Sequence, residues 1–103
     1  MQNNLIRKVK EKILKIEPDA EIILYGSRAR DDYRETSDWD YLILVNGIVS
    51  TGRTDKIRSA LYELEIETNQ IINSIIRSRE EWNSRKYSVL PLNENIEREG
   101  IRL

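Results

Sequence analysis

The sequence predicts an α+β fold, layered as in α/β proteins, in which helices pack against a mixed β-sheet of about four strands. Three observations predict it. Some segments repeat apolar residues at helical intervals, and others contain short unbroken apolar runs, the pattern of a buried strand. These segments follow one another in the order helix, strand, strand, helix, strand, helix, strand. The length of 103 residues suits one domain, residues 1–103, with its own core.

The first helix and the first strand lie on either side of Pro18. The helix ends there because the residue before a proline avoids helical angles. Residues 20–25 form the strand, and their apolar character is unbroken after Glu21, which predicts a central strand covered on both faces. The helix is recognised by the spacing of its apolar residues, which are Leu5, Ile6, Val9, Ile13 and Ile16.

A charged loop separates the first strand from the second, and its residues 28–36 are too polar to belong to the core. The second strand covers about residues 38–45, and the dipeptide Asn46–Gly47 then turns the chain. Thr54 is a candidate N-cap for a second helix that extends to about Glu67. The apolar stripe of this helix consists of Ile57, Ala60, Leu61 and Leu64.

The last third of the chain supplies a third strand, a final helix and a short terminal strand. Residues 69–78 have strong strand character, although Asn73 interrupts their run of isoleucines. Asn73 either faces solvent or points toward a functional site. Pro91 suits the first position of the final helix, in which Leu92 and Ile96 are expected to face inward.

The composition excludes several kinds of catalyst. The chain contains no cysteine and no histidine. This removes a disulfide framework, thiolate metal sites, catalysis by a Ser-His-Asp triad and nearly all zinc sites. A catalyst built from this chain must therefore use carboxylates, metal ions and cationic side chains that bind phosphate.

The charge and hydropathy patterns limit the classes of partner that the protein is expected to bind. The 17 basic and 18 acidic residues give a net charge of −1, without the basic excess that favours binding to nucleic acid. No apolar segment approaches the roughly 20 residues of a membrane span. The first residues lack the basic-then-apolar pattern of a secretory signal. We therefore expect a cytoplasmic protein that binds neither membranes nor nucleic acid.

Two acids stand at the head of the second strand. Asp38 and Asp40 are two positions apart, so in a strand they project from the same face, with Trp39 on the opposite face. Neighbouring carboxylates repel each other, and a cation between them relieves the repulsion. Mg²⁺ often uses only one or two protein carboxylates, with substrate phosphates completing its shell. The pair is either a metal site or an acidic strand start in a solvated turn.

The turn before the charged loop carries groups that suit a phosphate. Gly26 permits a positive φ and a close approach of the backbone to a ligand. The amides after Ser27 can form an anion-binding concavity, more so if a short helix begins there. Arg28 and Arg30 add permanently charged, planar donors. Alternatively, Gly-Ser is an ordinary turn and the arginines are solvated.

Residues 26–30, Gly-Ser-Arg-Ala-Arg, and residues 37–41, Ser-Asp-Trp-Asp-Tyr, together resemble the signature of the minimal nucleotidyltransferases of the polymerase-β-like nucleotidyltransferase superfamily. The resemblance implies a nucleotidyltransferase-like fold. It also implies that Asp38 and Asp40 are catalytic and bind Mg²⁺ or Mn²⁺, and that Gly26 and Ser27 hold the β- and γ-phosphates of a nucleoside triphosphate. The implied nucleotide site consists of Gly26, Ser27, Arg28, Arg30 and Ser37.

Two departures from the pattern of this family affect the expected activity. The minimal members usually have glycine after the second arginine, where this chain has Asp31, which either repels a triphosphate or caps the loop. Catalytic members also carry a third carboxylate on a later strand, and no aspartate takes that place here. The candidates for the position are Glu65, Glu67, Asn69 and Asn73.

Two functions follow from these residues and from the resemblance. The first is a metal-dependent nucleotidyltransferase that moves a nucleoside monophosphate from a nucleoside triphosphate, by resemblance ATP, to a hydroxyl acceptor. A domain this small has little room for an acceptor pocket, so the acceptor can belong to a partner protein. The resemblance suggests a helical partner of the HEPN type, for which such domains serve as antitoxins, in some cases by nucleotidylating it.

The alternative function is a catalytically weakened nucleotide-binding or antitoxin-type module that acts through a HEPN-like partner. It is motivated by Asp31 and by the missing third acid. A homo-oligomer is compatible with either function.

Overall fold

The computed structural model describes residues 2–103, with side chains from residue 4 onward. Its strands are β1 (Glu21–Tyr25), β2 (Trp39–Val45), β3 (Ile72–Ser78) and β4 (Ile101–Arg102). Within the described residues they form one four-stranded sheet in the order β3-β2-β1-β4. β1 is antiparallel to both β2 and β4, whereas β2 is parallel to β3. The predicted α+β fold with a mixed four-stranded sheet is confirmed.

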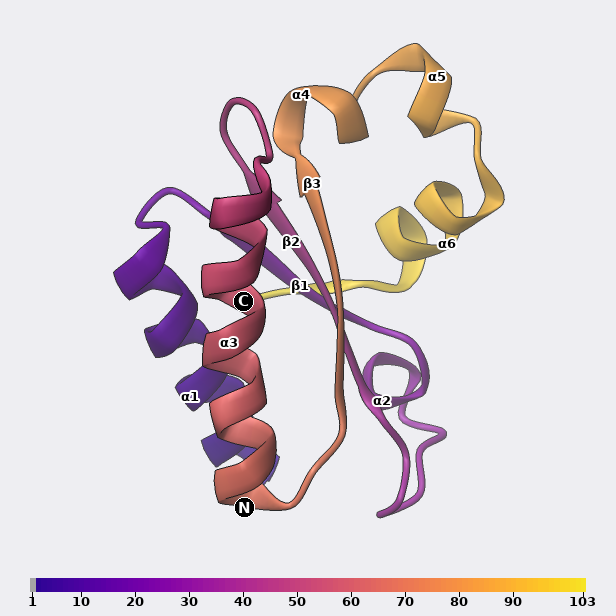
Figure 1. The fold of residues 1–103 in the computed structure, drawn as a ribbon. Coiled ribbons are helices and arrows are strands. Elements are labelled where there is room, and N and C mark those ends of the chain that lie inside the picture. Colours follow the sequence, from indigo (N-terminus) through magenta and orange to yellow (C-terminus); the bar gives the residue numbers. More distant parts are fainter. Residues whose placement is uncertain (1) are drawn as a thin grey trace.

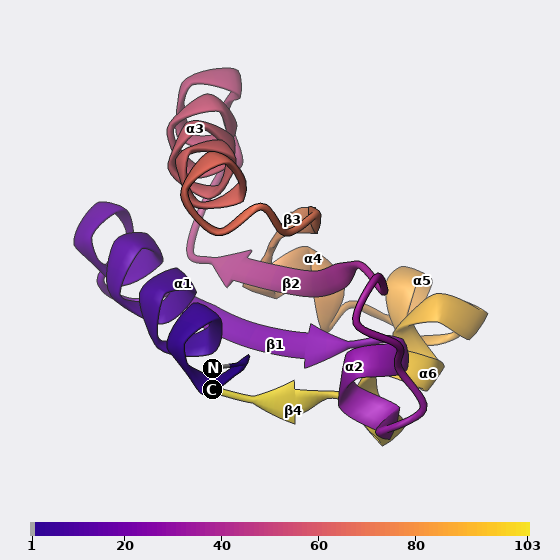
Figure 2. The ribbon, with the colours of Figure 1, turned by 90° about the horizontal axis from the view of Figure 1, so that it is seen from below.

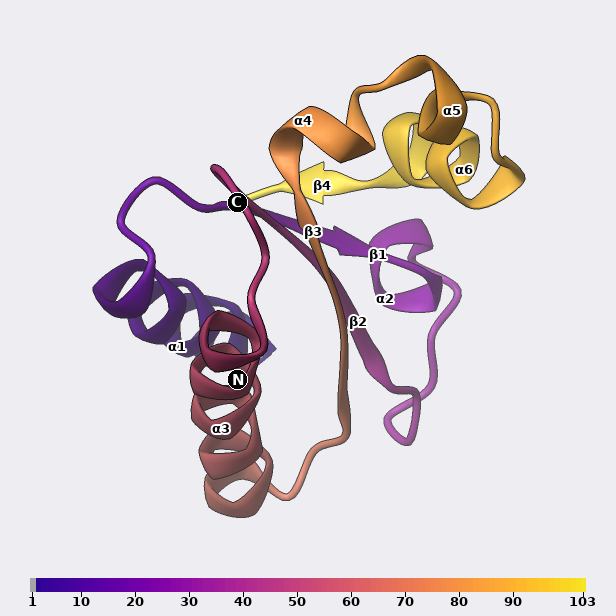
Figure 3. The same ribbon diagram turned by 45° about the horizontal axis from the view of Figure 1, so that its top comes forward.

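The helices lie on both faces of this sheet (Figures 1 and 2). The two long ones, α1 and α3, run side by side over one face, and the short α4, α5 and α6 follow β3 on the other side. Figure 3 shows β4 leading from α6 back to the edge of the sheet beside β1. The helices are α1 (Gln2–Ile16), α2 (Ser27–Arg30), α3 (Thr51–Thr68), α4 (Arg79–Trp82), α5 (Arg85–Ser88) and α6 (Pro91–Glu99).

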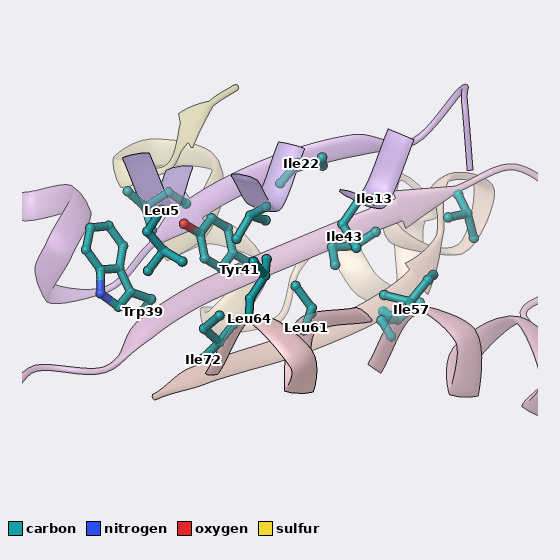
Figure 4. Close-up of a cluster of buried hydrophobic side chains, with 14 residues drawn as sticks. Leu5, Ile13, Ile22, Trp39, Tyr41, Ile43, Ile57, Leu61, Leu64 and Ile72 are labelled. Atoms are coloured by element: carbon teal, nitrogen blue, oxygen red, sulfur yellow. The ribbon is translucent and has the colours of Figure 1, made fainter. Parts of the chain in front are cut away.

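The larger core lies between the sheet and the helices α1 and α3 (Figure 4). Strand β2 contributes every second residue to it, beginning with Trp39 and Tyr41, because alternate side chains of a strand share a face. The apolar stripes predicted for the two helices form the other side of this core. Their buried members are Leu5, Val9, Ile13, Ile57, Ala60, Leu61 and Leu64.

A smaller core covers the opposite face of the sheet. Ile23 of β1 and two leucines of β2 meet Trp82 of α4 and Ile96 of α6 there. β1 therefore buries residues on both faces, as its unbroken apolar run predicted. Because Asp40 belongs to the same strand face as the two leucines, the smaller core borders the acid pair.

Two local expectations were wrong. Helix α3 begins before Thr54, and its N-cap is Ser50, whose Oγ accepts a hydrogen bond from the amide of Arg53 at 3.2 Å. Leu92 does not face inward, since 47% of its surface is exposed. Its neighbour Asn93 is buried instead and donates from Nδ2 to the carbonyl of Trp82 at 2.9 Å. An amide can face inward here because a helical carbonyl is free to accept from it.

Candidate functional site

The acid pair lies where β1 ends and where the parallel strands β2 and β3 begin, at one end of the sheet (Figure 1). Asp40 is paired in register with Tyr25 of β1 and with Asn73 of β3. Trp39 lies on the opposite face and is 3% exposed, in the core under α1 and α3 (Figure 4). Asp38 and Asp40 remain partly accessible. The strand geometry thus separates a buried aromatic face from an accessible acidic one.

Asn73 connects the two carboxylates. Its Nδ2 donates to Oδ2 of Asp38 at 3.0 Å and to Oδ1 of Asp40 at 3.1 Å. Both interpretations of Asn73 hold, since the residue is exposed to solvent and its side chain also points toward the two acids. Because one donor reaches both carboxylates, their oxygens face a common point, which is the arrangement that a bridging cation needs. The two carboxylates therefore fit a hard divalent cation, which would take the point that Nδ2 of Asn73 occupies.

The other candidates for a third acid lie elsewhere. Glu65 accepts from the amide of Ile72 through Oε2 at 2.7 Å, which fixes the start of β3. Glu67 pairs with Lys8 of α1 at 2.8 Å, and this hydrogen bond holds the pKa of Glu67 below its usual range. Asn69 ends α3 in the left-handed conformation, with φ of 56°. Among the side chains that the structure describes, no three or more acids, histidines or cysteines form a group that could hold a metal ion.

Gly26 brings the turn into direct contact with the acid pair. Its φ of 77° and ψ of −159° lie in a region that is essentially restricted to glycine. A Cβ atom at this position would lie 2.3 Å from Oδ2 of Asp40. Two requirements for glycine, one conformational and one steric, therefore coincide at the point where the turn passes the carboxylate.

A short helix begins directly after Gly26, an arrangement that would assist the binding of an anion at this turn. Ser27 is its first residue, and the amides of Ala29 and Arg30 donate to the carbonyl of Gly26 at 3.0 and 3.1 Å. The amide of Asp32 donates to the carbonyl of Ser27 at 3.3 Å and closes the turn. The structure thus places Gly26 beside Asp40, on a hydrogen-bonded turn that continues through Ser27.

The other residues of the implied nucleotide site, Arg28, Arg30 and Ser37, make hydrogen bonds or ion pairs within the chain. Arg28 is buried beneath the loop, so the expectation that residues 28–36 lie outside the core was wrong at this residue. Arg30 is partly exposed and pairs with Asp32 at 3.3 Å and with Glu99 at 3.4 Å. Ser37 accepts from the amide of Arg34 through Oγ at 2.8 Å. Of these three side chains, Arg30 is the one whose exposure leaves it able to turn toward a phosphate.

Asp31 ends the short helix in the left-handed conformation, with φ of 67° and ψ of 21°, and its amide donates to the carbonyl of Ser27. Of the two interpretations of Asp31, capping of the turn is therefore the one that the backbone supports. Left-handed angles are unfavourable for residues with a Cβ and are the usual place for glycine after a helix. This conformation explains why a glycine is common at this point of the turn.

Replacing Asp31 by Gly is expected to raise the free energy of unfolding by roughly 0.5 kcal/mol, since relief of the left-handed strain slightly exceeds the added freedom of the unfolded chain. Chemical denaturation measures the change. Asp31→Asn is the matched control, because asparagine tolerates the same angles without the charge and should leave stability nearly unchanged. A loss of stability in Asp31→Gly would contradict the capping role.

Tyr25 is a site residue that the sequence patterns did not single out. It ends β1, lies opposite Asp40 in register and packs beside the smaller core. Burial, with a further contribution from the negative charge of Asp40, raises the pKa of Tyr25 to about 12. The phenol therefore stays protonated at neutral pH. Two features of the sequence could have identified Tyr25 as a site residue: it directly precedes Gly26, and it ends the apolar run of β1.

A family model of the nucleotidyltransferase domain matches residues 6–101 of this chain. The match covers the turn, the acid pair, β1, β2, β3 and the first residue of β4. The chain belongs to the nucleotidyltransferase domain family. A comparison with curated proteins finds no match.

Membership in the nucleotidyltransferase domain family gives the site a general chemistry. Members act in nucleotidyl transfer and generally use a nucleoside triphosphate with a divalent metal ion. The two features of this nucleotidyltransferase domain that suit such a role are the acid pair and the Gly26–Ser27 turn. None of the helices that the structure describes has the length and apolar character to cross a membrane.

Proposed function

We propose that this nucleotidyltransferase domain transfers a nucleoside monophosphate from a nucleoside triphosphate, with ATP as the first candidate, to a hydroxyl acceptor. Asp38 and Asp40 are the metal-binding and catalytic residues, with Mg²⁺ or Mn²⁺ as the ion. Gly26 and Ser27 contact the β- and γ-phosphates, and Arg30 adds positive charge nearby.

The observation that carries the proposal is the contact between the turn and the acid pair. Asn73 Nδ2 lies within 3.1 Å of an oxygen of each acid, and Gly26 is so close to Asp40 that no Cβ fits between them. A phosphate chain on the turn would therefore lie beside the metal-binding oxygens. Phosphoryl transfer depends mainly on positioning and on charge stabilisation; this proximity would provide the positioning, and a cation bound by the acids would provide the charge stabilisation.

In the proposed reaction the acceptor oxygen forms a bond to the α-phosphorus, and the bond from that phosphorus to the bridging oxygen breaks. Pyrophosphate leaves, and the hydroxyl proton passes to solvent. Bound Mg²⁺ supplies the neutralisation of charge on the leaving group. Asp38 and Asp40 would hold the ion, the turn would orient the triphosphate, and Tyr25 lies opposite Asp40 on the neighbouring strand.

The acceptor is proposed to lie on a second protein, because a domain of 103 residues offers little surface for an acceptor pocket of its own. A helical protein of the HEPN type is the partner to test first, with the nucleotidyltransferase domain acting as its antitoxin. Purification of the chain from its native host under mild conditions, followed by mass spectrometry of the eluate, tests this. A lone monomer with full activity toward a small-molecule hydroxyl would contradict it.

Transfer itself is tested by incubating the protein with Mg²⁺ and α-labelled ATP, in the presence and absence of the co-purified protein. The expected result is release of pyrophosphate and label on a hydroxyl group of the acceptor. Mn²⁺ and the other common nucleoside triphosphates form the parallel reactions. Absence of both label and pyrophosphate under all these conditions would contradict a transferase.

A second candidate function, nucleotide binding without turnover, is favoured by one observation. The residue that faces the acid pair from β3 is the amide Asn73, not an acid. A carboxylate there could accept the proton of the attacking hydroxyl, whereas an amide cannot. Calorimetry with Mg²⁺ and ATP separates the two functions, since the binding module would bind the nucleotide without releasing pyrophosphate.

Replacing Asn73 by Asp places a third carboxylate beside the other two. We expect Mg²⁺ affinity and the rate of transfer each to rise by roughly tenfold or more, since a positioned general base contributes about 10²–10⁴-fold. Transfer of label at saturating and limiting Mg²⁺ measures both effects. Asn95→Asp, on the exposed surface of α6, is the matched control for added charge. Unchanged affinity in Asn73→Asp would show that this position does not face the ion.

A further inference from the structure

We propose that Arg28 is a positioning residue that holds the loop of residues 31–38 and thereby fixes Asp38 and Asp40 against the Gly26–Ser27 turn. The inference rests on the proposed function, because it concerns the alignment of the same site. It replaces the phosphate-binding role that the sequence pattern suggested for Arg28.

The guanidinium of Arg28 is already engaged by the loop. It is 7% exposed, although arginine is rarely buried. Its Nη2 donates to the carbonyls of Glu35 at 3.0 Å and Ser37 at 3.1 Å, and its Nε reaches the carbonyl of Ser37 at 3.3 Å. Two carbonyls of the loop, two residues apart, are therefore tied to one side chain of the short helix.

Two aromatic rings enclose the same guanidinium. Its central carbon lies 4.5 Å from the ring centroid of Tyr33 and 4.4 Å from that of Trp39. Both distances are within the range of cation–π attraction, which strengthens when the cation is desolvated. A planar group with donors along its edges is able to stack on rings and bond carbonyls together, and lysine is not.

Trp39 transmits this arrangement to the acids because it stands between them in the chain. Its amide donates to the carbonyl of Ile71 at 2.9 Å, and its indole Nε1 donates to Oε1 of Gln70 at 3.2 Å. The ring is thus held by Arg28 on one side and by the start of β3 on the other. An indole fixed in this way sets the direction in which Asp38 and Asp40 leave the opposite face of the strand.

The chain of contacts joins the three parts of the site. Arg28 belongs to α2, which begins at Ser27, and its partners belong to the loop and to β2. Loosening the loop would let Asp38 move relative to the turn without unfolding the sheet. A displacement of about 1 Å is enough to cost on the order of 10²-fold in a positioned reaction.

The test compares wild type with Arg28→Lys, which keeps the charge but loses the planar fork. Nitrogen-15 relaxation gives order parameters for the amides of residues 31–38, and calorimetry with Mn²⁺ alone gives the affinity of the acid pair. We expect loop order parameters to fall from about 0.8 to below about 0.6, while β1 is unchanged. Mn²⁺ affinity should weaken by roughly tenfold, in line with second-shell losses.

Two further variants make the comparison specific. Arg34→Lys changes an exposed arginine of the same loop and should alter neither quantity. Tyr33→Leu removes one of the stacked rings and should shift both quantities in the same direction as Arg28→Lys, by a smaller amount. If Arg28→Lys fails to fold, Tyr33→Leu still tests the positioning role through the same two measurements.

The outcomes separate the inference from the function on which it rests. An ordered loop in Arg28→Lys, or a mobile loop with wild-type Mn²⁺ affinity, would overturn the positioning role. Wild-type protein that does not bind Mn²⁺ would overturn the proposed function, and the positioning role with it. A mobile loop together with weakened Mn²⁺ binding supports the inference, because a general loss of stability would leave the folded protein's affinity unchanged.

Discussion

Replacing Asp40 by Asn is expected to lower nucleotide transfer by about 10³-fold or more, since loss of a charged metal ligand removes several kcal/mol of transition-state stabilisation. The fold should survive, because asparagine has nearly the same shape and Asp40 is not part of either core. The free energy of unfolding should be unchanged or slightly higher, because the variant removes repulsion from Asp38. Transfer of α-labelled nucleotide and chemical denaturation measure the two effects.

Asp55→Asn is the control for Asp40→Asn, because Asp55 is an exposed acid on α3 and the substitution changes net charge by the same amount. It should transfer label at the wild-type rate. Equal transfer by Asp40→Asn and wild type would contradict the mechanism. A further set of measurements, with Mn²⁺ in place of Mg²⁺, should show the same ranking of the variants.

Replacing Gly26 by Ala is expected to have the largest effect on stability, lowering the free energy of unfolding by roughly 3 kcal/mol and Tm by roughly 15 °C. Alanine must leave the glycine-only backbone region or remain strained in it. Its Cβ would also lie 2.3 Å from Oδ2 of Asp40, so the carboxylate has to move. Thermal and chemical unfolding measure the loss, and the displaced carboxylate should weaken Mn²⁺ binding at the same time.

Gly52→Ala is the matched control for Gly26→Ala. Gly52 lies in the first turn of α3, and a Cβ there meets no atom within 4 Å. Alanine should therefore stabilise the protein, by about 0.5–1 kcal/mol from helix propensity. In the double variant Gly26→Ala, Asp40→Ala, removal of the carboxylate should restore the stability lost to the steric clash. The stability lost to backbone strain at position 26 should not return. Wild-type stability in Gly26→Ala would show that the turn does not press on the acid.

The main elements and the acid pair could be predicted because they depend on local periodicity. The alternation of a strand places Asp38 and Asp40 on one face and Trp39 on the other, whatever the rest of the chain does. The apolar runs likewise identify the sheet and its covering helices. These are statements about neighbours in the sequence, and the structure agrees with them.

The role of Asn73 could not be decided from the sequence, because it depends on which strands pair and in what register. Parallel pairing of β2 with β3 places Asn73 beside Asp40 and leaves Glu65 in the last turn of α3 and Asn69 at its C-cap. A shift of one residue would have turned a different side chain toward the acids. Register is set by packing across the whole sheet.

The burial of Arg28 was missed for a related reason. A charged residue in a charged loop is expected to be solvated, and its carbonyl partners carry no signature in the sequence. The two rings that enclose it, Tyr33 and Trp39, are five and eleven positions away, and their convergence is a property of the folded loop. The cap at Ser50 escaped notice in the same way, since Thr54 is an equally good capping residue by type.

The most direct test of the central claim, that Asp38 and Asp40 form a metal site beside the Gly26–Ser27 turn, is a titration of nitrogen-15-labelled protein with Mn²⁺. Paramagnetic broadening should first remove the amide signals of Gly26, Ser27, Asp38, Asp40 and Asn73. Broadening that begins instead around the acids of α3, or that spreads evenly over the surface, would contradict the claim.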